Sequence, residues 1–384
     1  MEQKKKKLIS GNNFIPVCEP LLEGNEEKYL LECVRTNWIS SQGKYVEEFS
    51  KKFAEFCGAK YCVLTTSGTT ALHLALVALG VGKGDEVIIP AFTMIATAFA
   101  VIYTGATPVL VDSEPETGNI DPLKIEEKIT KNTKVILPVH IYGHPFDMDP
   151  IMKLARRYKL WVVEDAAEAH GAEYKGKKVG GIGDIGCFSF YANKIITMGE
   201  GGCVVANNEK LFQKLNMLHD LAHSPQKRFL HEMVGFNYRL TNLQAAVGLA
   251  QLEQVDKFIK ARRRNAELYN YYLKGIEGLR LPIEKKWAKN VYWMYGVLLE
   301  KNLGVGRDEL MEFLAKEGIG TRAFFEPMNR QPVFKKIGLF KQEKYPVAED
   351  WGNRGLYLPS SSGLTEEKIK HIAEKIKKFF RRKR

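Results

Sequence analysis

The sequence predicts an α/β fold in which a mostly parallel central sheet with flanking helices is followed by a smaller C-terminal α+β domain. From residue 61 onward, short apolar runs alternate with amphipathic segments, which is the pattern of parallel strands joined by helical crossovers. The chain has 384 residues, enough for a second core, because single hydrophobic cores stop growing near roughly 250–300 residues. We expect a flexible basic N-terminus over residues 1–14, a large domain over 15–255, and the smaller domain, with a basic terminal helix, over 256–384.

Apolar runs separated by turn residues predict strands at residues 61–65, 86–89, 107–111, 134–139 and 160–164. Two further buried strands are expected at 187–190 and 202–205. Helices are expected at 71–79, 93–103, 122–130, 149–158 and 209–221, and over a long stretch that ends near residue 273. In the C-terminal part, residues 292–299 predict a strand and residues 307–316 a helix.

Composition places the chain among ordinary globular proteins. Hydrophobic residues make up 45% and charged residues 27%, which argues against a disordered or fibrous chain. No apolar run reaches the roughly 20 residues that span a bilayer, and no apolar segment follows the first lysines, so we expect no membrane span, no secretory signal and a cytoplasmic location. The six cysteines are dispersed without metal-ligand spacing, so we expect free thiols and no metal site.

The net charge of +12 lies mostly in two tails. Residues 1–7 carry four lysines against one glutamate, and residues 366–384 carry nine Lys and Arg against three Glu. The rest of the chain is only mildly basic, which suits an anionic small substrate about as well as a polyanion. A nucleic-acid-binding or regulatory protein is the alternative from another class, but we expect no nucleic-acid partner.

An anion site is predicted where the strand at 61–65 runs into a Ser-Gly-Thr turn and then an apolar helix. Ser67, Gly68 and Thr69 would bring hydroxyls and free backbone N–H groups to a helix N-terminus, where phosphate binds readily. The alternative is that Ser67 or Thr69 simply caps the helix and binds no ligand.

An acidic residue, Asp165, ends the apolar strand at 160–164. Ligands of open parallel sheets gather at the carboxyl ends of the strands, so this carboxylate stands where a catalytic or cofactor-binding acid would be. The alternative is that Asp165 caps a helix over residues 166–170.

A single lysine, Lys194, lies between the two buried strands expected at 187–190 and 202–205. A desolvated lysine loses its proton readily and becomes a nucleophile that can form a Schiff base. The alternative is a loop lysine whose amino group extends to water.

Three other stretches carry candidate binding residues. Residues 36–43 are polar around a large aromatic, and form either a loop that closes over a ligand or an arm that wraps the domain. Asn237 and Arg239 alternate with aromatic residues in an extended segment, where polar side chains need partners. Residues 322–332 are rich in aromatic residues and proline.

These motifs occur in an order that resembles a known family. The Ser-Gly-Thr turn is followed by Asp-Ala-Ala-Glu at 165–168, Phe-Ser-Phe-x-x-x-Lys at 188–194, Gly-Glu-Gly-Gly at 199–202 and Gly-x-Asn-x-Arg-Leu at 235–240. From about residue 15 to 332 the chain resembles the pyridoxal-phosphate-dependent sugar aminotransferases of the DegT/DnrJ/EryC/StrS type. That resemblance implies the PLP-dependent transferase fold of type I.

The resemblance also implies roles around the cofactor ring. Lys194 would form the Schiff base with pyridoxal phosphate and afterwards move a proton. Asp165 would face the pyridine nitrogen, and Glu168 would lie by the phenolic oxygen. Met94 stands where relatives often place an aromatic residue against the ring, and a thioether still makes a favourable contact with an aromatic face.

The phosphate would be bound by residues of two chains. Gly68, Thr69 and Ser189 would use N–H and hydroxyl groups, with Ser67 beside them, and Asn237 would reach the same phosphate from a second subunit. The resemblance therefore implies a homodimer whose active sites are shared between the subunits.

The substrates follow from the same resemblance. L-Glutamate would be the amino donor, leaving as 2-oxoglutarate, and the acceptor would be the C4 ketone of a nucleotide-linked 4-keto-6-deoxy sugar. Residues 92–97, 164–170 and 236–242 are most similar to members that act on a GDP-linked ketosugar. The residues alone do not distinguish guanine from uracil or thymine, so UDP- and dTDP-linked ketosugars stay open.

Two other reactions on the same cofactor also stay open, a dehydration and the transamination of a small amino alcohol. Lys194 favours transamination, since dehydratases of this type have histidine at that place. The residues expected to contact the sugar nucleotide and its pyrophosphate are Trp38, Ser40, Arg239, Arg322, Asn329 and Arg330.

Overall fold

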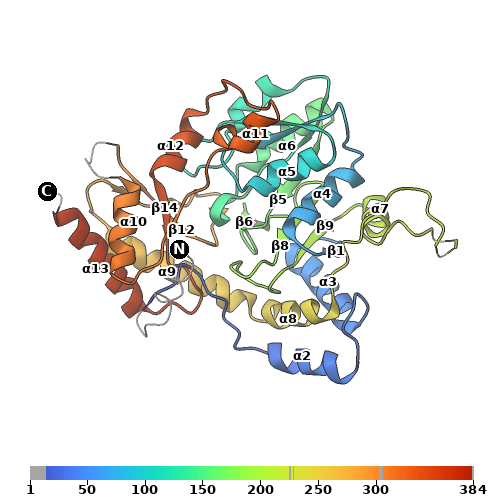
Figure 1. The fold of residues 1–384 in the computed structure, drawn as a ribbon, viewed down its shortest axis with the longest axis horizontal. Helices are drawn as coiled ribbons and strands as arrows, with labels where there is room; N and C mark the ends of the chain where they lie inside the picture. The colour runs from blue at the N-terminus through green and yellow to red at the C-terminus, as the bar shows by residue number, and fades with distance from the viewer. Residues whose placement is uncertain (1–13, 225, 228, 302–305, 383–384) are drawn as a thin grey trace.

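The computed structural model describes residues 14–224, 226–227, 229–301 and 306–382. The flexible basic N-terminus expected over residues 1–14 therefore lies almost entirely outside the described residues. Figure 1 shows the central sheet and its helices on one side of the molecule, and the C-terminal helix with the strands beside it on the other. The two helices α8 (Asn242–Leu252) and α9 (Val255–Leu273) run along one edge from the first part to the second.

The central sheet has seven strands in the order β1-β9-β8-β5-β4-β2-β3. Their bounds are β1 (Tyr61–Thr65), β2 (Glu86–Pro90), β3 (Thr107–Val111), β4 (Thr133–Ile136), β5 (Trp161–Asp165), β8 (Ile185–Ser189) and β9 (Gly202–Ala206). The five strands from β3 to β8 pair in parallel, whereas β9 is antiparallel to both β8 and β1. The expected mostly parallel sheet is confirmed, and the carboxyl ends of β1, β5 and β8 share one edge.

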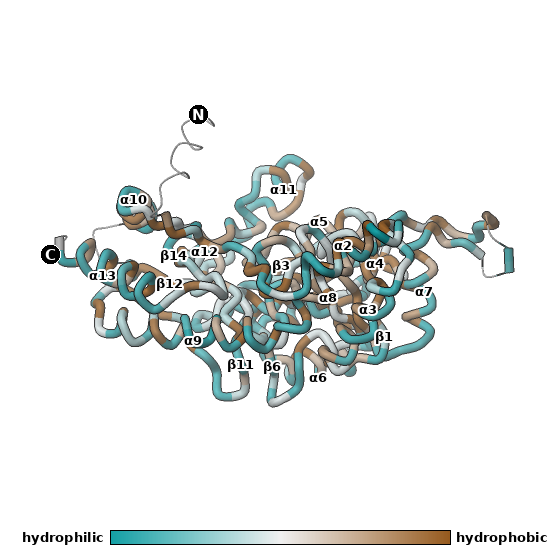
Figure 2. The backbone as a smooth tube through the Cα atoms, turned by 90° about the horizontal axis from the view of Figure 1, so that it is seen from below, coloured by the Kyte–Doolittle hydropathy of each residue, from teal (hydrophilic) through white to brown (hydrophobic). Residues whose placement is uncertain are grey.

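Helices cover both faces of this sheet. They are α2 (Glu26–Arg35), α3 (Lys44–Cys57), α4 (Gly68–Ala78), α5 (Ile95–Tyr103), α6 (Met148–Tyr158) and α7 (Glu209–His219). Figure 2 shows α4 and α5 on one side and α6 on the other. This is the arrangement that right-handed crossovers require, because α5 leads from β2 outward to β3 while α6 leads from β4 in the opposite direction to β5.

The C-terminal part is built on a four-stranded sheet in the order β10-β12-β14-β13. Its elements are β10 (Leu279–Arg280), β12 (Tyr295–Leu299), α10 (Arg307–Lys316), β13 (Arg322–Ala323), α11 (Pro332–Lys336), α12 (Pro346–Arg354), β14 (Gly355–Leu358) and α13 (Glu366–Arg382). A separate hydrophobic cluster joins this sheet to α9 and α13, with Tyr269 stacked on Tyr295 at a ring distance of 4.6 Å. A small third sheet pairs β11 (Ala288–Lys289) with β6 (Glu173–Tyr174) and β7 (Lys177–Lys178).

Three of the differences between expected and observed elements have a local cause. Residues 122–130 form two short 3-10 helices, Pro122–Lys124 and Glu126–Lys128, because Ile129 turns to an extended conformation. The long helix expected up to residue 273 is divided at Gln254, whose backbone (φ −113°, ψ 7°) leaves the helical region. The strand expected to reach residue 139 ends at Ile136, two residues before Pro138, which has no N–H to donate to a neighbouring strand.

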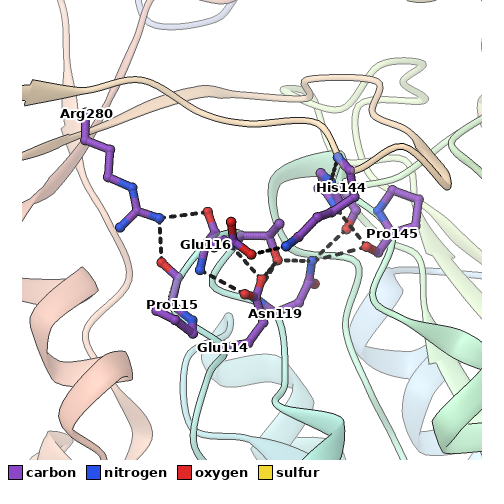
Figure 3. A network of polar contacts seen from close by, with 9 residues as sticks. Glu114, Pro115, Glu116, Asn119, His144, Pro145 and Arg280 are labelled. Carbon is purple, nitrogen blue, oxygen red and sulfur yellow. Dashed lines mark hydrogen bonds and ion pairs between the residues drawn. The ribbon is translucent and has the colours of Figure 1, made fainter.

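A polar network joins the C-terminal part to the loop after β3 (Figure 3). Arg280 donates hydrogen bonds to the carbonyls of Pro115 and Glu116, and the backbone N–H of Lys285 donates to Nε2 of His144 across 3.1 Å. Asn119 donates to the carbonyl of His144 across 3.2 Å. His144 and Asn119 are each 3% exposed, so their part of the network lies in the folded interior, whereas the contacts of Arg280 lie at the surface.

In the part of the chain that the structure describes, no helix combines the length and apolar character needed to cross a membrane.

Candidate active site

A cavity of about 350 Å³ opens at the edge where β1, β5 and β8 end. This is where ligands of open parallel sheets bind. Of the residues singled out in the sequence, those that line it are Ser67, Gly68, Thr69, Met94, Asp165, Glu168, Ser189, Lys194 and Arg322.

One end of the cavity is the N-terminus of α4. Ser67 is its N-cap and accepts a hydrogen bond from the N–H of Thr70 across 3.2 Å. Capping leaves other N–H groups of the first turn without partners inside the helix, so capping and anion binding are compatible here. A Cβ added to Gly68 would lie 2.7 Å from Cβ of Ser189, so the absence of a side chain keeps a hollow open between the helix and β8.

The buried acid Asp165 stands at the end of β5. Its carboxylate accepts hydrogen bonds from the N–H of Ala167 across 3.2 Å and from the hydroxyl of Thr97 across 2.9 Å. Residues 166–170 form turns, so Asp165 does not cap a helix there. Burial raises the pKa of Asp165, and both hydrogen bonds oppose that rise because they favour the carboxylate.

Lys194 lies on the loop between β8 and β9, whose base is closed by the N–H of Phe190 donating to the carbonyl of Gly201. Its side chain is 10% exposed, so it does not extend to water. The Nζ atom lies 3.9 Å from Oε1 of Glu168 and 3.6 Å from the centroid of the Trp293 ring. Burial lowers the pKa of Lys194, which favours the neutral and nucleophilic amine.

Glu168 lines the cavity next to the lysine. It is 3% exposed and accepts a hydrogen bond from the N–H of Tyr142 across 2.8 Å. Burial raises the pKa of Glu168, because a carboxylate loses its hydration there. Met94, the N-cap of α5, borders the same space and is 48% exposed, so its thioether is available to a ligand.

The other predicted residues lie outside the cavity of this chain. Trp38 borders a second, open cavity, the carbonyl of Ser40 accepts from the N–H of Asn242, and Asn237 is exposed. Arg239 is paired with Asp220, and Arg330 with Glu326. Asn329 is 5% exposed and donates to Glu349 across 2.8 Å, which identifies it as a buried structural residue of this chain.

Several lining residues were not identified from the sequence. They are Leu72, Thr93, Ala96, Val139, Ala167, Tyr191, Asn193, Glu200, Trp293, Phe325 and Tyr357. Behind them, Thr97 is buried and bonded to Asp165. Thr97 and Asn193 lie close in sequence to residues that were singled out, but nothing local marks Trp293 or Tyr357, which the fold brings in from the C-terminal part.

The combination of these groups defines a class of enzyme. A helix N-terminus with free N–H groups, a buried carboxylate and a buried lysine around one cavity would suit the phosphate, the ring nitrogen and the aldehyde of pyridoxal phosphate. The hollow at Gly68 is the feature a phosphate cradle needs, since an added Cβ would fill it. The fold and this site are those of a pyridoxal-phosphate-dependent transferase of fold type I.

Comparison with known proteins specifies the family. Residues 20–377 match the DegT/DnrJ/EryC1/StrS aminotransferase family, and the chain belongs to it. It is 48% identical to a GDP-perosamine synthase of Caulobacter vibrioides over 360 residues, which cover 93% of this chain and 96% of that protein.

Solved structures agree with this assignment. DesV of S. venezuelae superimposes with a TM-score of 0.90 at 34% identity, covering 96% of this chain and 99% of that one. The PLP form of the putative sugar aminotransferase Spr1654 from Streptococcus pneumoniae gives 0.90 at 26% identity, covering 97% and 100%. The protein is therefore a pyridoxal-phosphate-dependent sugar aminotransferase, as the sequence motifs predict.

Proposed function

We propose that the protein transfers the amino group of L-glutamate to C4 of GDP-4-keto-6-deoxymannose, forming GDP-perosamine and 2-oxoglutarate. The observation that carries the sugar assignment is the 48% identity, over 93% of the chain, to a protein named GDP-perosamine synthase. The observation that carries the reaction type is the buried lysine amine in a cavity that also holds an anion site and a buried acid.

Each residue of the cavity has a separate role in the proposed reaction. When bound, pyridoxal phosphate would supply an aldehyde carbon that takes up the amino group with loss of water, and a ring that accepts electrons. Lys194 would hold the cofactor in the resting enzyme and, once released, would use Nζ to take the proton from the α-carbon of L-glutamate. Asp165 would keep a proton on the ring nitrogen, and Glu168 would interact with the phenolic oxygen.

The N–H groups of Gly68 and Thr69 and the hydroxyls of Ser67 and Ser189 would hold the phosphate. Met94 would contact the face of the cofactor ring. Arg322 brings a positive charge to the outer part of the same cavity, where it suits the pyrophosphate of a sugar nucleotide.

We also propose that the enzyme is a homodimer with shared active sites. The segment after α7 forms a short hairpin in which His223 bridges to His231, and it extends away from the body of the subunit (Figure 1). It carries Met233 and Val234, which are 41% and 84% exposed. A second copy that covers these apolar side chains would also approach Asn237, which is then free to reach the partner's phosphate site. Trp38, Ser40, Arg239 and Arg330 would contact the sugar nucleotide across that interface, and Asn329 would support the short 3-10 helix that carries Arg330.

We place the reaction in the cytoplasm. All six cysteines are free, and four of them are buried, which suits a reducing compartment.

The test of the substrate is a panel of nucleotide-linked 4-keto-6-deoxy sugars. GDP-, UDP- and dTDP-linked sugars are each incubated with the enzyme and ¹⁵N-labelled L-glutamate, and the products are examined by mass spectrometry and by NMR at C3 and C4. We expect ¹⁵N at C4 of the GDP-linked sugar. Label in only the UDP- or dTDP-linked sugar would refute the GDP assignment but leave the transamination intact.

A further inference from the structure

One wall of the lysine site comes from a distant part of the chain. Trp293 precedes β12 and lies 100 residues beyond Asn193, the neighbour of the lysine. Its side chain is 3% exposed and lines the cavity. It is therefore a buried group of the C-terminal part that faces the reacting lysine.

The face of the indole ring receives the amino group of Lys194. Nζ lies 3.6 Å from the ring centroid, well inside the roughly 6 Å over which a cation is attracted to an aromatic face. The carboxylate of Glu168, at 3.9 Å, is beyond hydrogen-bonding distance. The ring is thus in direct contact with the amino group and favours its protonated form. Burial, the largest effect, and the charge of Arg262 lower the pKa of Lys194, whereas Glu168, Asp165 and Cys18 also raise it.

The edge of the same ring fixes the loop that carries the lysine. The indole N–H donates to the carbonyl of Asn193 across 2.7 Å, and the thiol of Cys18 donates to the same carbonyl across 3.3 Å. Two contacts of one side chain therefore act on neighbouring residues, one on the backbone before Lys194 and one on its amino group.

The backbone of Trp293 is fixed by a buried arginine. Its carbonyl accepts a hydrogen bond from Nη1 of Arg262, which is 3% exposed and also donates through Nε to the hydroxyl of Ser362 across 3.2 Å. Because its backbone is anchored in this way, the ring is a fixed surface for the lysine.

We propose that Trp293 is a positioning residue for Lys194: its ring face holds the amino group whenever that group is not joined to the cofactor, and its N–H fixes the lysine loop. In this position the amino group keeps the proton it has taken from the amino donor until it passes the proton on. The inference rests on the proposed role of Lys194 and adds a residue to it.

The test follows the capture of pyridoxal phosphate by the cofactor-free, full-length protein at a series of pH values. Capture forms a bond between Nζ and the aldehyde carbon and releases water, and only the neutral amine attacks, so the rate rises with pH through the pKa of Lys194. The near-visible absorbance of the product gives the rate without any turnover.

Two variants distinguish the effect of the ring face on Lys194 from the effect of the indole N–H on the lysine loop. In Trp293→Leu the ring no longer favours the protonated amine, so we expect the midpoint to move about one pH unit lower, a tenfold change in the equilibrium constant. Trp293→Phe keeps a ring face but loses the donor to Asn193, so we expect a smaller shift in the same direction. Trp161→Phe is the matched control, because Trp161 begins β5 whereas Asp165, which lines the cavity, ends it. We expect this variant to keep the wild-type midpoint.

An unchanged midpoint in a folded Trp293→Leu protein would overturn the proposal. If that variant does not fold, Trp293→Met fills more of the space and carries the same expectation. Lys194→Ala is measured alongside: a borohydride-reducible bond that persists in it refutes the role of Lys194. If the bond to the cofactor forms only when Lys194 is present, but the pH midpoint is the same in Trp293→Leu as in the wild type, only the role of Trp293 is refuted.

Discussion

The hydroxyl of Thr97 donates a hydrogen bond to the carboxylate of Asp165 across 2.9 Å, and both side chains are buried. Thr97 lies on α5 and Asp165 ends β5, so the bond connects two elements that meet behind the proposed cofactor ring. A hydrogen bond to the ionised form of an acid lowers its pKa. Thr97 therefore helps Asp165 to remain a carboxylate in spite of its burial.

This relationship predicts the effect of Thr97→Val, which keeps the shape and removes the donor. The pKa of Asp165 should rise further, and kcat with L-glutamate should fall about tenfold, the effect of losing one hydrogen bond to a charged group. Thr104→Val, at the other end of α5, removes a hydroxyl that bonds to Val101 and is the matched control. Equal kcat values for the two variants would show that the Thr97 hydroxyl does not act through Asp165.

Asp165→Ala tests the acid directly. Lys194 remains in place, so the covalent attachment of the cofactor should still form and show its near-visible absorbance. Without a carboxylate at the ring nitrogen the ring accepts electrons poorly, and we expect kcat to fall by at least about a hundredfold. Turnover at the wild-type rate would reduce Asp165 to a structural residue.

Gly68→Ala should close the phosphate cradle. Its new Cβ would lie 2.7 Å from that of Ser189, so the serine or the helix must move. We expect the Kd for pyridoxal phosphate, measured by absorbance titration, to rise about tenfold, the loss of roughly one good hydrogen bond to an anion. At Gly82 the nearest atom to an added Cβ is 4.0 Å away, so Gly82→Ala is the control and should bind the cofactor normally.

Mixing two inactive proteins tests whether the active site is shared. The Lys194→Ala subunit lacks the lysine but supplies Asn237 to its partner. The Asn237→Ala subunit keeps its own Lys194 and can receive Asn237 from the Lys194→Ala subunit. In randomly reassorted dimers half of the molecules contain one intact site, so activity should recover to about one quarter of the wild-type value. If Asn237 acts within its own subunit, no mixture regains activity beyond the sum of its parts.

His144 predicts how stability depends on pH. Burial lowers the pKa of His144 to about 4, against 6.5 for an exposed histidine. Between these values the unfolded chain binds a proton that the folded chain does not, so the stabilisation is complete above pH 6.5 and is lost as the pH falls towards 4. Unfolding by urea at a series of pH values should show a loss of up to about 3 kcal/mol from this residue.

The control for that measurement is His144→Asn, which keeps a polar side chain next to Lys285. Buried His170 has a pKa lowered to about 3 and contributes a similar pH dependence in both proteins. The difference between the two pH profiles therefore isolates His144. Parallel profiles would contradict the assignment.

The sequence by itself determined the groups that lie at strand ends or beside them. Ser67, Asp165, Ser189 and Lys194 each follow or end an apolar run, and parallel strands bring their carboxyl ends to one edge, so their convergence follows from the local pattern. The helix at Arg307–Lys316 was predicted with its correct bounds, because its apolar residues repeat at a helical period between clear boundaries. The order of the motifs was enough to indicate the family.

Only the tertiary structure decided which distant residues reach the lysine and which predicted ones do not. Arg322 lines the cavity whereas Asn329, seven residues on, is buried against Glu349, and the sequence between them contains no signal that separates the two. Trp293 is brought to Lys194 by the packing of the C-terminal part against the central sheet. Strand periodicity describes one element at a time, but contacts such as this one depend on how two elements pack, which is set by the summed complementarity of their buried surfaces.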